Sequence, residues 1–273
     1  MLIVKRVNMP THLVTGASDG IGKQTALELE QQGATVLVHG RSEARAAEAV
    51  KALGKGDLVP VWGDLASLKE VNAMADRVLA KHPVLDVLVN NAGVFMKQRE
   101  LSVDGFELTL AVNHFGHFVL THRLLPALKA AKAARIVHVS SMAHQRGELD
   151  LTDLGFERGF HGYTAYAASK LANVLFSNEL ARRLKGTNVT SNALHPGVIR
   201  TKLLATGFGM GGASLKSGAV TSVYCATSPA LEGVSGEYFS DARRAEASPA
   251  ARDLKLQREL YELSCRLTGV APL

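Results

Sequence analysis

The sequence predicts an α/β fold in which helices cover both faces of a mainly parallel sheet, and three observations support this. Short apolar runs rich in β-branched residues suit strands that are buried on both faces. These runs alternate with longer amphipathic stretches, and such strand–helix units form right-handed crossovers around one sheet. A glycine-rich loop between the first run and the first helix is typical of a doubly wound, Rossmann-type arrangement. We therefore expect a Rossmann-type sheet of seven strands.

Seven runs have the character of strands, and the stretches between them have the character of helices. No linker rich in Pro, Ser or Gly interrupts the series, so we expect residues 1–273 to form a single dinucleotide-binding and catalytic domain. A charged stretch with spaced leucines near the C-terminus is expected to be a solvated helix with one packed face. The strands are predicted at residues 13–15, 35–38, 58–61, 84–89, 136–139, 189–194 and 237–240, and the helices at 21–32, 43–53, 67–81, 106–131, 164–185 and 252–266.

Two segments do not fit this alternation of predicted strands and helices. Residues 1–9 precede the first strand and are expected to form an N-terminal arm. Residues 202–216 contain the run Thr206-Gly207-Phe208-Gly209-Met210-Gly211-Gly212, which is flexible by composition. Long loops inside a compact α/β domain are usually functional, so we interpret 202–216 as a candidate substrate lid.

The composition excludes several classes of protein. Hydrophobic residues make up 47% and charged residues 21% of the chain, which rules out intrinsic disorder. No apolar run reaches about 18 residues and the N-terminus lacks a signal-peptide pattern, so we expect a cytoplasmic protein without a membrane span. The 2 cysteines cannot form a disulfide framework, which agrees with a reducing compartment.

The charge balance leaves the kind of partner open at first. The 31 basic and 25 acidic residues give a formal net charge of +6, which fits a nucleic acid, an acidic surface or an anionic small ligand. No stretch clusters Lys and Arg with aromatic residues, so we expect no nucleic-acid partner.

The loop Thr15-Gly16-Ala17-Ser18-Asp19-Gly20-Ile21-Gly22 follows the first strand and opens the first helix. Its glycines permit a tight turn and a close approach of the backbone to a phosphate, and the helix N-terminus adds N–H donors and a positive dipole. The spacing Gly-x-x-x-Gly-x-Gly differs from the standard dinucleotide fingerprint, but its position after a strand favours phosphate binding over a plain turn. The predicted cofactor contacts are Gly16, Ser18, Gly20, Ile21 and Gly22.

The end of the second strand indicates which dinucleotide binds. NAD sites commonly place Asp or Glu here, about 20 residues after the loop, to bond the ribose 2′-hydroxyl. Gly40 stands at that place and Arg41 follows it. A guanidinium binds a 2′-phosphate in a bidentate manner, whereas an acid would repel it. We therefore expect Arg41 to favour NADP(H) over NAD(H); the alternative is a solvated residue before a helix.

Tyr166 and Lys170 lie four residues apart and so share one face of a predicted helix. A free phenol with a pKa near 10 is poorly matched to proton transfer at neutral pH, and a nearby ammonium lowers that pKa. Tyr163 is a rival, but Ala167 rather than a lysine stands four residues beyond it. Ser141, at the carboxyl end of a strand, can bond the same substrate oxygen. These residues predict an acid–base site beside a nicotinamide.

Taken in order along the chain, these motifs resemble those of the short-chain dehydrogenase/reductase family. The resemblance implies hydride transfer between NADP(H) and a small carbonyl or alcohol substrate. The implied catalytic residues are Asn113, Ser141, Tyr166 and Lys170, with the asparagine holding a water that links the lysine to solvent. The matching elements, which span nearly the whole chain, are the glycine loop, Asp64-Leu65, Asn90-Asn91-Ala92-Gly93, Asn113, Ser141, Tyr166 with Lys170, and Pro196-Gly197 with Thr201.

The resemblance also implies roles in cofactor binding. Asp64 and Leu65 would contact the adenine ring, and Lys170 would bond the nicotinamide ribose in addition to acting on Tyr166. The residues implied beneath the adenosine portion are Asn91, Ala92 and Gly93, and those implied beside the nicotinamide are Pro196, Gly197, Val198 and Thr201.

Within the family, the segments Gly20–Lys23, Val112–Phe118 and Ser169–Asn173 resemble the retinol dehydrogenase branch. Many members of that branch prefer NADP, in agreement with Arg41, although Asp19 occupies a position that is often basic in NADP users. The branch also acts on substrates that are not retinoids, so retinoid, steroid and small aromatic carbonyls stay open. Related proteins form homodimers or homotetramers, which implies a homo-oligomer.

Other chemistries fit the sequence less well. His114, His117 and His122 lack the Cys or carboxylate partners of a metal site, so no metal is expected. Ser–His–Asp hydrolysis lacks a Gly-x-Ser-x-Gly elbow around any serine. An epimerase or dehydratase on the same fold, and a non-catalytic NADP(H)-binding regulator, stay as alternatives to the oxidoreductase.

Overall fold

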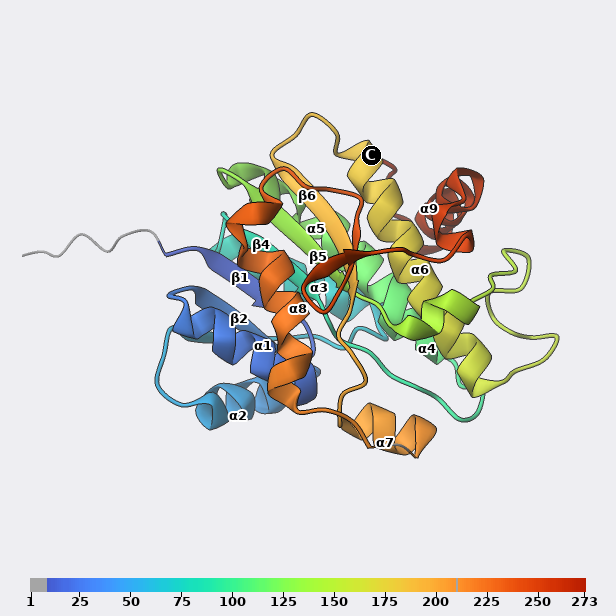
Figure 1. Ribbon diagram of the computed structural model, residues 1–273, viewed down its shortest axis with the longest axis horizontal. Coiled ribbons are helices and arrows are strands. Elements are labelled where there is room, and N and C mark those ends of the chain that lie inside the picture. The colour runs from blue at the N-terminus through green and yellow to red at the C-terminus, as the bar shows by residue number, and fades with distance from the viewer. Residues whose placement is uncertain (1–8, 210) are drawn as a thin grey trace, which may run out of the picture.

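The computed structural model describes residues 9–209 and 211–273, and at its centre lies a sheet of eight strands with helices on both faces (Figure 1). The strand order is β3-β2-β1-β4-β5-β6-β7-β8. Neighbours from β3 to β7 pair in parallel, and β8 pairs antiparallel with β7. The strands are β1 (Thr11–Val14), β2 (Thr35–Gly40), β3 (Leu58–Trp62), β4 (Val87–Asn90), β5 (Ala134–Val139), β6 (Val189–His195), β7 (Tyr238–Ser240) and β8 (Arg243–Ala245).

This strand order creates the position where a ligand can bind. β1 pairs with β2 on one side and with β4 on the other, so the chain leaves the centre of the sheet in opposite directions. In open α/β sheets, ligands occupy the crevice beyond the carboxyl ends of the strands at such a switch point. The glycine loop follows β1 and Asn91 follows β4, so both lie at this crevice.

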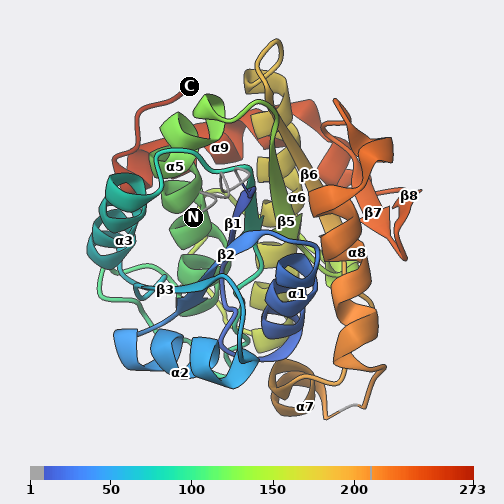
Figure 2. The ribbon, with the colours of Figure 1, turned by 90° about the vertical axis from the view of Figure 1, so that its left-hand side faces the viewer.

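The helices form two layers around the sheet (Figure 2). The first layer is α1, α2 and α8, and the second is α3, α5 and α6, with α9 packed against α6. The longer helices are α1 (Gly20–Gln31), α2 (Glu43–Leu53), α3 (Leu68–Lys81), α5 (Gly116–Ala130), α6 (Gly162–Arg183), α8 (Leu215–Thr227) and α9 (Leu254–Thr268), and the short ones are α4 (Leu108–Leu110) and α7 (Lys202–Phe208).

Adjacent residues on β1 supply the two cores. Leu13 packs with Met74 and Phe118 in the layer of α3 and α5, whereas Val14 packs with Leu29 in the layer of α1. Successive side chains of a strand point to opposite faces, and each fully buried aliphatic side chain contributes roughly 1.5–3 kcal/mol. Because helices cover both faces of the sheet, the strand sequences are continuous apolar runs.

The prediction of seven strands is wrong by one, because β8 adds an antiparallel edge strand. Asp241 and Ala242 join β7 to β8 with positive φ values of 50° and 54°, as a two-residue hairpin turn requires. All three residues of β8 are exposed, and two of them are Arg243 and Arg244. A charged edge strand carries no apolar alternation and therefore gives no strand signal in the sequence.

The helix predicted at 106–131 is divided into three pieces. Glu107 caps the short helix α4 by accepting from the backbone N–H groups of Thr109 and Leu110. A π-helical turn, Ala111–Phe115, then connects α4 to α5 and carries Asn113. Single π turns inside helices frequently mark functional sites, because they alter the direction of one side chain.

The candidate lid at 202–216 contains regular structure as well as glycines. It begins with the helix α7, which Thr201 caps through its side chain, and it ends in the first turn of α8. Residue 210 of this segment, like residues 1–8 of the expected N-terminal arm, lies outside the described residues.

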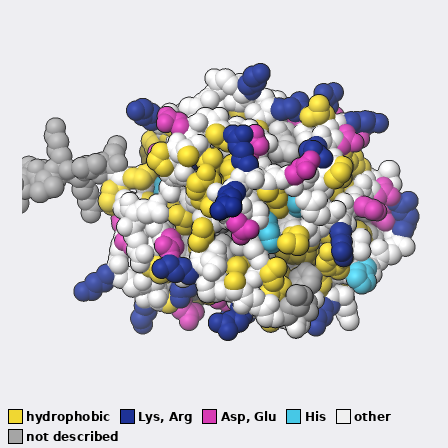
Figure 3. All heavy atoms as spheres, in the orientation of Figure 1, with side chains coloured by type: hydrophobic (Ala, Val, Ile, Leu, Met, Phe, Trp, Pro, Cys, Tyr) yellow, Lys and Arg dark blue, Asp and Glu magenta, His cyan; other side chains and the backbone are white. Residues whose placement is uncertain are grey.

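Two further features concern the surface. None of the helices in the described part of the chain combines the length and the apolar character that a bilayer crossing requires. On the face shown in Figure 3, Lys and Arg side chains are dispersed among acidic and apolar ones and do not gather into one patch.

Candidate active site

A cleft of about 1350 Å³ lies at the carboxyl ends of the parallel strands. All the cofactor residues predicted from the sequence line it, although they come from many parts of the chain. They are Gly16, Ser18, Gly20, Ile21, Gly22, Arg41, Asp64, Leu65, Asn91, Ala92, Gly93, Tyr166, Lys170, Pro196, Gly197, Val198 and Thr201, and the predicted catalytic Ser141 joins them. Asn113 lies behind this wall and is fully buried.

The glycine loop has the geometry of a phosphate cradle. Gly16 has a φ of +64° and sits so close to Ala92 that an added Cβ would lie 2.8 Å from the Ala92 Cα. A Cβ on Gly22 would overlap Asn91 Nδ2 and the Gly16 carbonyl oxygen. The N–H groups at the start of α1 lie at the positive end of the helix, where Gly20 and Ile21 line the cleft, and the Asp19 carboxylate accepts from the Gly20 N–H at 2.8 Å. These features fit the pyrophosphate of a dinucleotide.

Thr15 ties this loop to the strand β4 and to the π turn. Its Oγ1 accepts from the backbone N–H groups of Asn91 (2.8 Å) and Ala92 (3.0 Å) and lies 2.9 Å from His117 Nε2. The other ring nitrogen, Nδ1, lies 3.1 Å from the Asn113 carbonyl oxygen and must donate to it. Thr15 therefore donates to His117 Nε2. Burial lowers the pKa of His117 to about 3, so the ring is neutral while it makes these two hydrogen bonds.

A second buried histidine, His39, holds the loop from the side of β2. Its Nδ1 accepts from Gly16 N–H at 2.9 Å, and its Nε2 donates to the Gly63 carbonyl at 2.9 Å. Burial lowers the pKa of His39, so the neutral tautomer that makes both bonds is favoured. Sequence reasoning missed this residue, because its partners lie 23 and 24 positions away.

The end of β2 offers basic side chains to the cleft and has no room for an acid at its last position. A Cβ on Gly40 would lie 2.7 Å from the backbone nitrogen of Ala46, so Asp or Glu at this place would displace α2. Arg41 and Arg45 both line the cleft and are both exposed. Two guanidinium groups therefore lie at the end of the cleft where β2 stops.

Tyr166 and Lys170 meet on one face of α6, where Lys170 Nζ lies 5.6 Å from the centroid of the Tyr166 ring. Lys170 also donates to the Val139 carbonyl at 3.0 Å. Burial lowers the pKa of Lys170 to about 8 and raises the pKa of Tyr166 to about 12. The direction for Tyr166 is opposite to the expected one, because desolvation of the phenol outweighs its other interactions, including the hydrogen bond with Ser141 that lowers its pKa.

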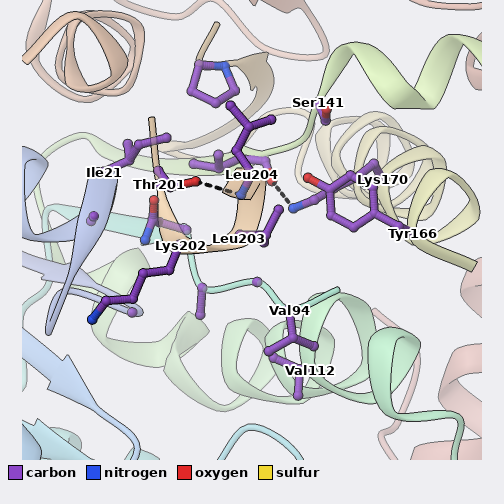
Figure 4. Close-up of a pocket in the computed structure, with 18 of the residues that line it drawn as sticks. Ile21, Val94, Val112, Ser141, Tyr166, Lys170, Thr201, Lys202, Leu203 and Leu204 are labelled. Atoms are coloured by element: carbon purple, nitrogen blue, oxygen red, sulfur yellow. Dashed lines mark hydrogen bonds between the residues drawn. The ribbon is translucent and has the colours of Figure 1, made fainter. Parts of the chain in front are cut away.

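The two serines after β5 have different partners. Ser140 is buried, and its Oγ donates to the Lys170 carbonyl at 2.7 Å. Ser141 is partly exposed, lines the cleft and bonds Tyr166. Figure 4 shows Ser141 close to Tyr166 and Lys170 in the cleft. The second serine is therefore the one that can reach a substrate.

Asn113 supports the floor of the cleft from below. Its Oδ1 accepts from Val94 N–H at 2.8 Å, and its Nδ2 donates to the Val94 carbonyl at 3.1 Å and to Ser169 Oγ at 2.9 Å. A Cβ on Gly93 would lie 3.4 Å from Lys170 Nζ and 3.5 Å from Asn113 Oδ1, so Gly93 lies beside both of these side chains. The amide of Asn113 is thus fully engaged within the protein.

The segment that begins at Thr201 covers one side of the cleft. In Figure 4, Leu203 and Leu204 lie between Ile21 and Tyr166. Thr201 Oγ1 accepts from Leu204 N–H at 3.1 Å, which fixes the start of α7. Further along, a Cβ on Gly207 would lie 2.9 Å from the Phe95 ring, so α7 packs closely against that ring.

The three histidines considered as metal ligands, His114, His117 and His122, contact other groups of the protein. His114 Nε2 lies 2.9 Å from Ser264 Oγ, and His122 contacts the Phe118 carbonyl and the Tyr261 hydroxyl. Among the residues that the structure describes, no three His, Cys, Asp or Glu side chains are grouped so that they could hold a metal ion.

A phosphate cradle at a Rossmann-type switch point, with a tyrosine–lysine pair at the far end of the same cleft, defines a dinucleotide-dependent oxidoreductase. Residues 10–208 match the family model described as short chain dehydrogenase. The chain therefore belongs to the short-chain dehydrogenase family, whose members use NAD(P)(H).

Individual relatives agree with this assignment. Mouse retinol dehydrogenase 14 is 44% identical over 287 residues, which cover 95% of this chain and 86% of the relative. The crystal structure of an uncharacterized protein from Mycobacterium paratuberculosis is 34% identical with a TM-score of 0.83, covering 97% and 98% of the two chains. A short chain dehydrogenase from Escherichia coli, solved with NADPH, is 26% identical with a TM-score of 0.70, covering 86% and 97%.

Proposed function

We propose that this protein transfers a hydride between NADP(H) and a carbonyl or alcohol substrate, with Tyr166 as the general acid and base. The observation that carries the proposal is the convergence of Ser141, Tyr166 and Lys170 at one end of the cleft that the glycine loop lines at the other. The nicotinamide, when bound, supplies or accepts the hydride. The residues of the chain bind and orient the reactants and move the proton.

In the reductive direction, Tyr166 Oη donates its proton to the substrate oxygen as negative charge develops there. Ser141 Oγ donates a hydrogen bond to the same oxygen. Burial raises the pKa of Tyr166 to about 12, so the phenol is protonated at neutral pH but is a weak acid, and its proton transfer depends on stabilisation of the phenolate. Proton transfer by a positioned side chain contributes about 10²- to 10⁴-fold to a rate.

Lys170 stabilises the phenolate that this step leaves behind. With a pKa of about 8, its side chain is mainly an ammonium at neutral pH, and it lies 5.6 Å from the Tyr166 ring centroid. The bond to the Val139 carbonyl fixes its position. In the oxidative direction, the same positive charge must offset the burial that opposes ionisation of Tyr166.

The preference for NADP(H) rests on the end of β2. Arg41 is exposed at the rim of the cleft, and Gly40 has no room for the acid that would read a ribose hydroxyl. The NADPH complex of the E. coli relative supports this cofactor. Asp19, the departure from the pattern of NADP users, is bonded to Gly20 N–H and to Lys202, which supports a local role for its carboxylate.

The lining beyond Tyr166 supports a largely apolar substrate. Its side chains come from five separate segments, namely the chain after β4, the π turn, the turn after Ser141, the chain after β6 and the helix α7. Those that line the cleft include Val94, Met96, Val112, Met142, Val198, Leu203 and Leu204. The relatives named retinol dehydrogenase agree with this, and retinoid, steroid and small aromatic carbonyls are all compatible with such a lining.

Two further proposals accompany this function. Residues 202–216 act as a lid over the substrate, which is supported by the contacts of α7 with the cleft. The protein is also proposed to be a homodimer or homotetramer, which rests on the resemblance to related enzymes and is tested by light scattering.

The absorbance of NADPH, followed with aldehydes and ketones of graded size and with NADP and alcohols in reverse, tests the function directly. We expect carbonyl-dependent oxidation of NADPH that the substitution Ser141→Ala strongly reduces. An epimerase or dehydratase would produce no net redox change, and a regulator would bind NADPH without turnover. Either result, obtained with protein shown by calorimetry to bind NADPH, contradicts the proposal.

A further inference from the structure

Two buried histidines outside the proposed acid–base set hold opposite ends of one peptide group. That group is the peptide between Ser141 and Met142. His144 Nδ1 lies 2.7 Å from the Ser141 carbonyl oxygen, and Met142 N–H donates to His195 Nδ1 at 3.2 Å. His144 is fully buried, and His195 is 7% exposed at the end of β6.

The hydrogen-bond partners determine the protonation of both rings. A carbonyl oxygen can only accept, so His144 donates through Nδ1, while its Nε2 accepts from Ser248 N–H at 3.1 Å. His195 must keep a lone pair on Nδ1 in order to accept from Met142. Both rings are therefore neutral, one as the donor and the other as the acceptor for the same peptide group.

This arrangement controls the direction of the Ser141 side chain. The two peptide groups that flank a residue fix its φ and ψ, and hence the direction of its Cα–Cβ bond. The sheet holds the chain one peptide group earlier, because the Ser140 N–H, which belongs to the Val139–Ser140 peptide, donates to the Leu194 carbonyl at 2.8 Å. The two histidines hold the following group, and Ser141 rests in extended backbone with φ of −160° and ψ of 158°.

We propose that His144 and His195 are positioning residues that clamp the Ser141–Met142 peptide and so aim the Ser141 hydroxyl at the substrate oxygen beside Tyr166. This role rests on the proposed function, in which Ser141 bonds that oxygen. Misplacement of a reacting group by about 1 Å can cost about 10²-fold in rate. Loss of either imidazole therefore lowers kcat and leaves the binding of NADPH unchanged.

The chain offers matched substitutions for each contact. The amide of His195→Asn keeps an acceptor near the Nδ1 position, whereas His195→Leu removes it. His144→Asn keeps a donor for the Ser141 carbonyl, whereas His144→Gln places its amide near Nε2 and keeps only the contact with Ser248. We expect His195→Leu and His144→Gln to lower kcat by roughly 10- to 100-fold. We expect each Asn variant to recover most of that loss.

A double-mutant cycle distinguishes positioning from a general structural effect. Each histidine variant is measured alone and with Ser141→Ala, for kcat and KM with NADPH and an active carbonyl, and for NADPH affinity by calorimetry. A residue that acts only through Ser141 causes no additional loss of kcat once that hydroxyl is absent. We expect this non-additivity together with an unchanged affinity for NADPH. Should His195→Leu not fold, His195→Gln takes its place in the cycle.

The outcomes separate the clamp from the function on which it rests. An active wild-type enzyme in which His195→Leu lowers kcat by the same factor with and without Ser141 overturns the clamp alone. The clamp also fails if His195→Leu and His144→Gln both retain wild-type kcat. A wild-type protein that binds NADPH but oxidises it with no carbonyl overturns the proposed function, and with it this role of Ser141.

Discussion

Lys202 Nζ lies 2.5 Å from Asp19 Oδ2, so an ion pair joins the first residue of α7 to the glycine loop, and both residues line the cleft. Asp19 also accepts from Gly20 N–H at 2.8 Å and thereby caps α1. The side chains of Lys202 and Asp19 are 88% and 57% exposed. The pair therefore links the proposed lid to the phosphate cradle at little cost or gain to the stability of the fold.

We expect Lys202→Gln to loosen the lid without destabilising the protein. An exposed ion pair contributes roughly 0–1 kcal/mol, so the thermal midpoint should stay the same. Cleavage by chymotrypsin within 202–216 should become several-fold faster, because α7 loses a contact that holds it to the loop. Lys216→Gln, an exposed lysine at the start of α8, serves as the control. If chymotrypsin cleaves the two variants at the same rate, the ion pair between Asp19 and Lys202 does not hold α7 to the glycine loop.

Arg41→Ala tests the choice of cofactor. Removal of a guanidinium that bonds a phosphate should weaken NADPH binding by roughly 10- to 100-fold, while NADH binding changes little. Calorimetric titration of both cofactors measures the ratio directly. The control is Lys51→Ala, an exposed basic residue at the other end of α2. Equal losses for NADPH and NADH would show that Arg41 does not read the 2′-phosphate.

Five histidines, four of them buried and one half-buried, predict a steep loss of stability in mild acid. Burial lowers the pKa of each of them to about 3 or 4, whereas in the unfolded chain the pKa is near 6.5. The unfolded state therefore binds more protons as the pH falls below 6.5, and stability that is present above that value is lost. The five residues are His12, His114, His117, His122 and His138.

The expected size of this effect is large. Between pH 7 and pH 5.5, each such histidine lowers the free energy of unfolding by a little over about 1 kcal/mol, so five lower it by about 6 kcal/mol. Proteins of this kind are stable by about 5–15 kcal/mol, so urea midpoints should fall sharply over this range. A free energy of unfolding that is the same at both pH values would contradict the burial of these rings as neutral groups.

The sequence located most of the cleft because its chemistry is carried by short local motifs. The glycine loop and the Tyr166–Lys170 pair each occupy one continuous segment, and each is attached to the carboxyl end of a strand or to a helix face. Local periodicity therefore places them at the correct edge of the sheet. The predicted cofactor residues consequently line one cleft.

What the sequence could not show depends on contacts between distant segments. The partners of His39, His195 and His144 include backbone groups 23, 53 and 104 positions away, and nothing in the local pattern distinguishes a packed histidine from a bonded one. The raised pKa of Tyr166 follows from burial by several elements at once. The strand β8 was not predicted because its exposed arginines are typical of a loop.

Tyr166 is proposed to transfer the proton, and the substitution Tyr166→Phe removes the group that would carry it. The substitution removes only the hydroxyl and keeps the ring that packs against Phe95. The rate of NADPH oxidation with an active carbonyl should fall by at least about 10²-fold, while NADPH affinity stays within a few-fold of wild type and Tyr163→Phe retains turnover. A Tyr166→Phe enzyme that still oxidises NADPH at a near-normal rate would show that another group transfers the proton.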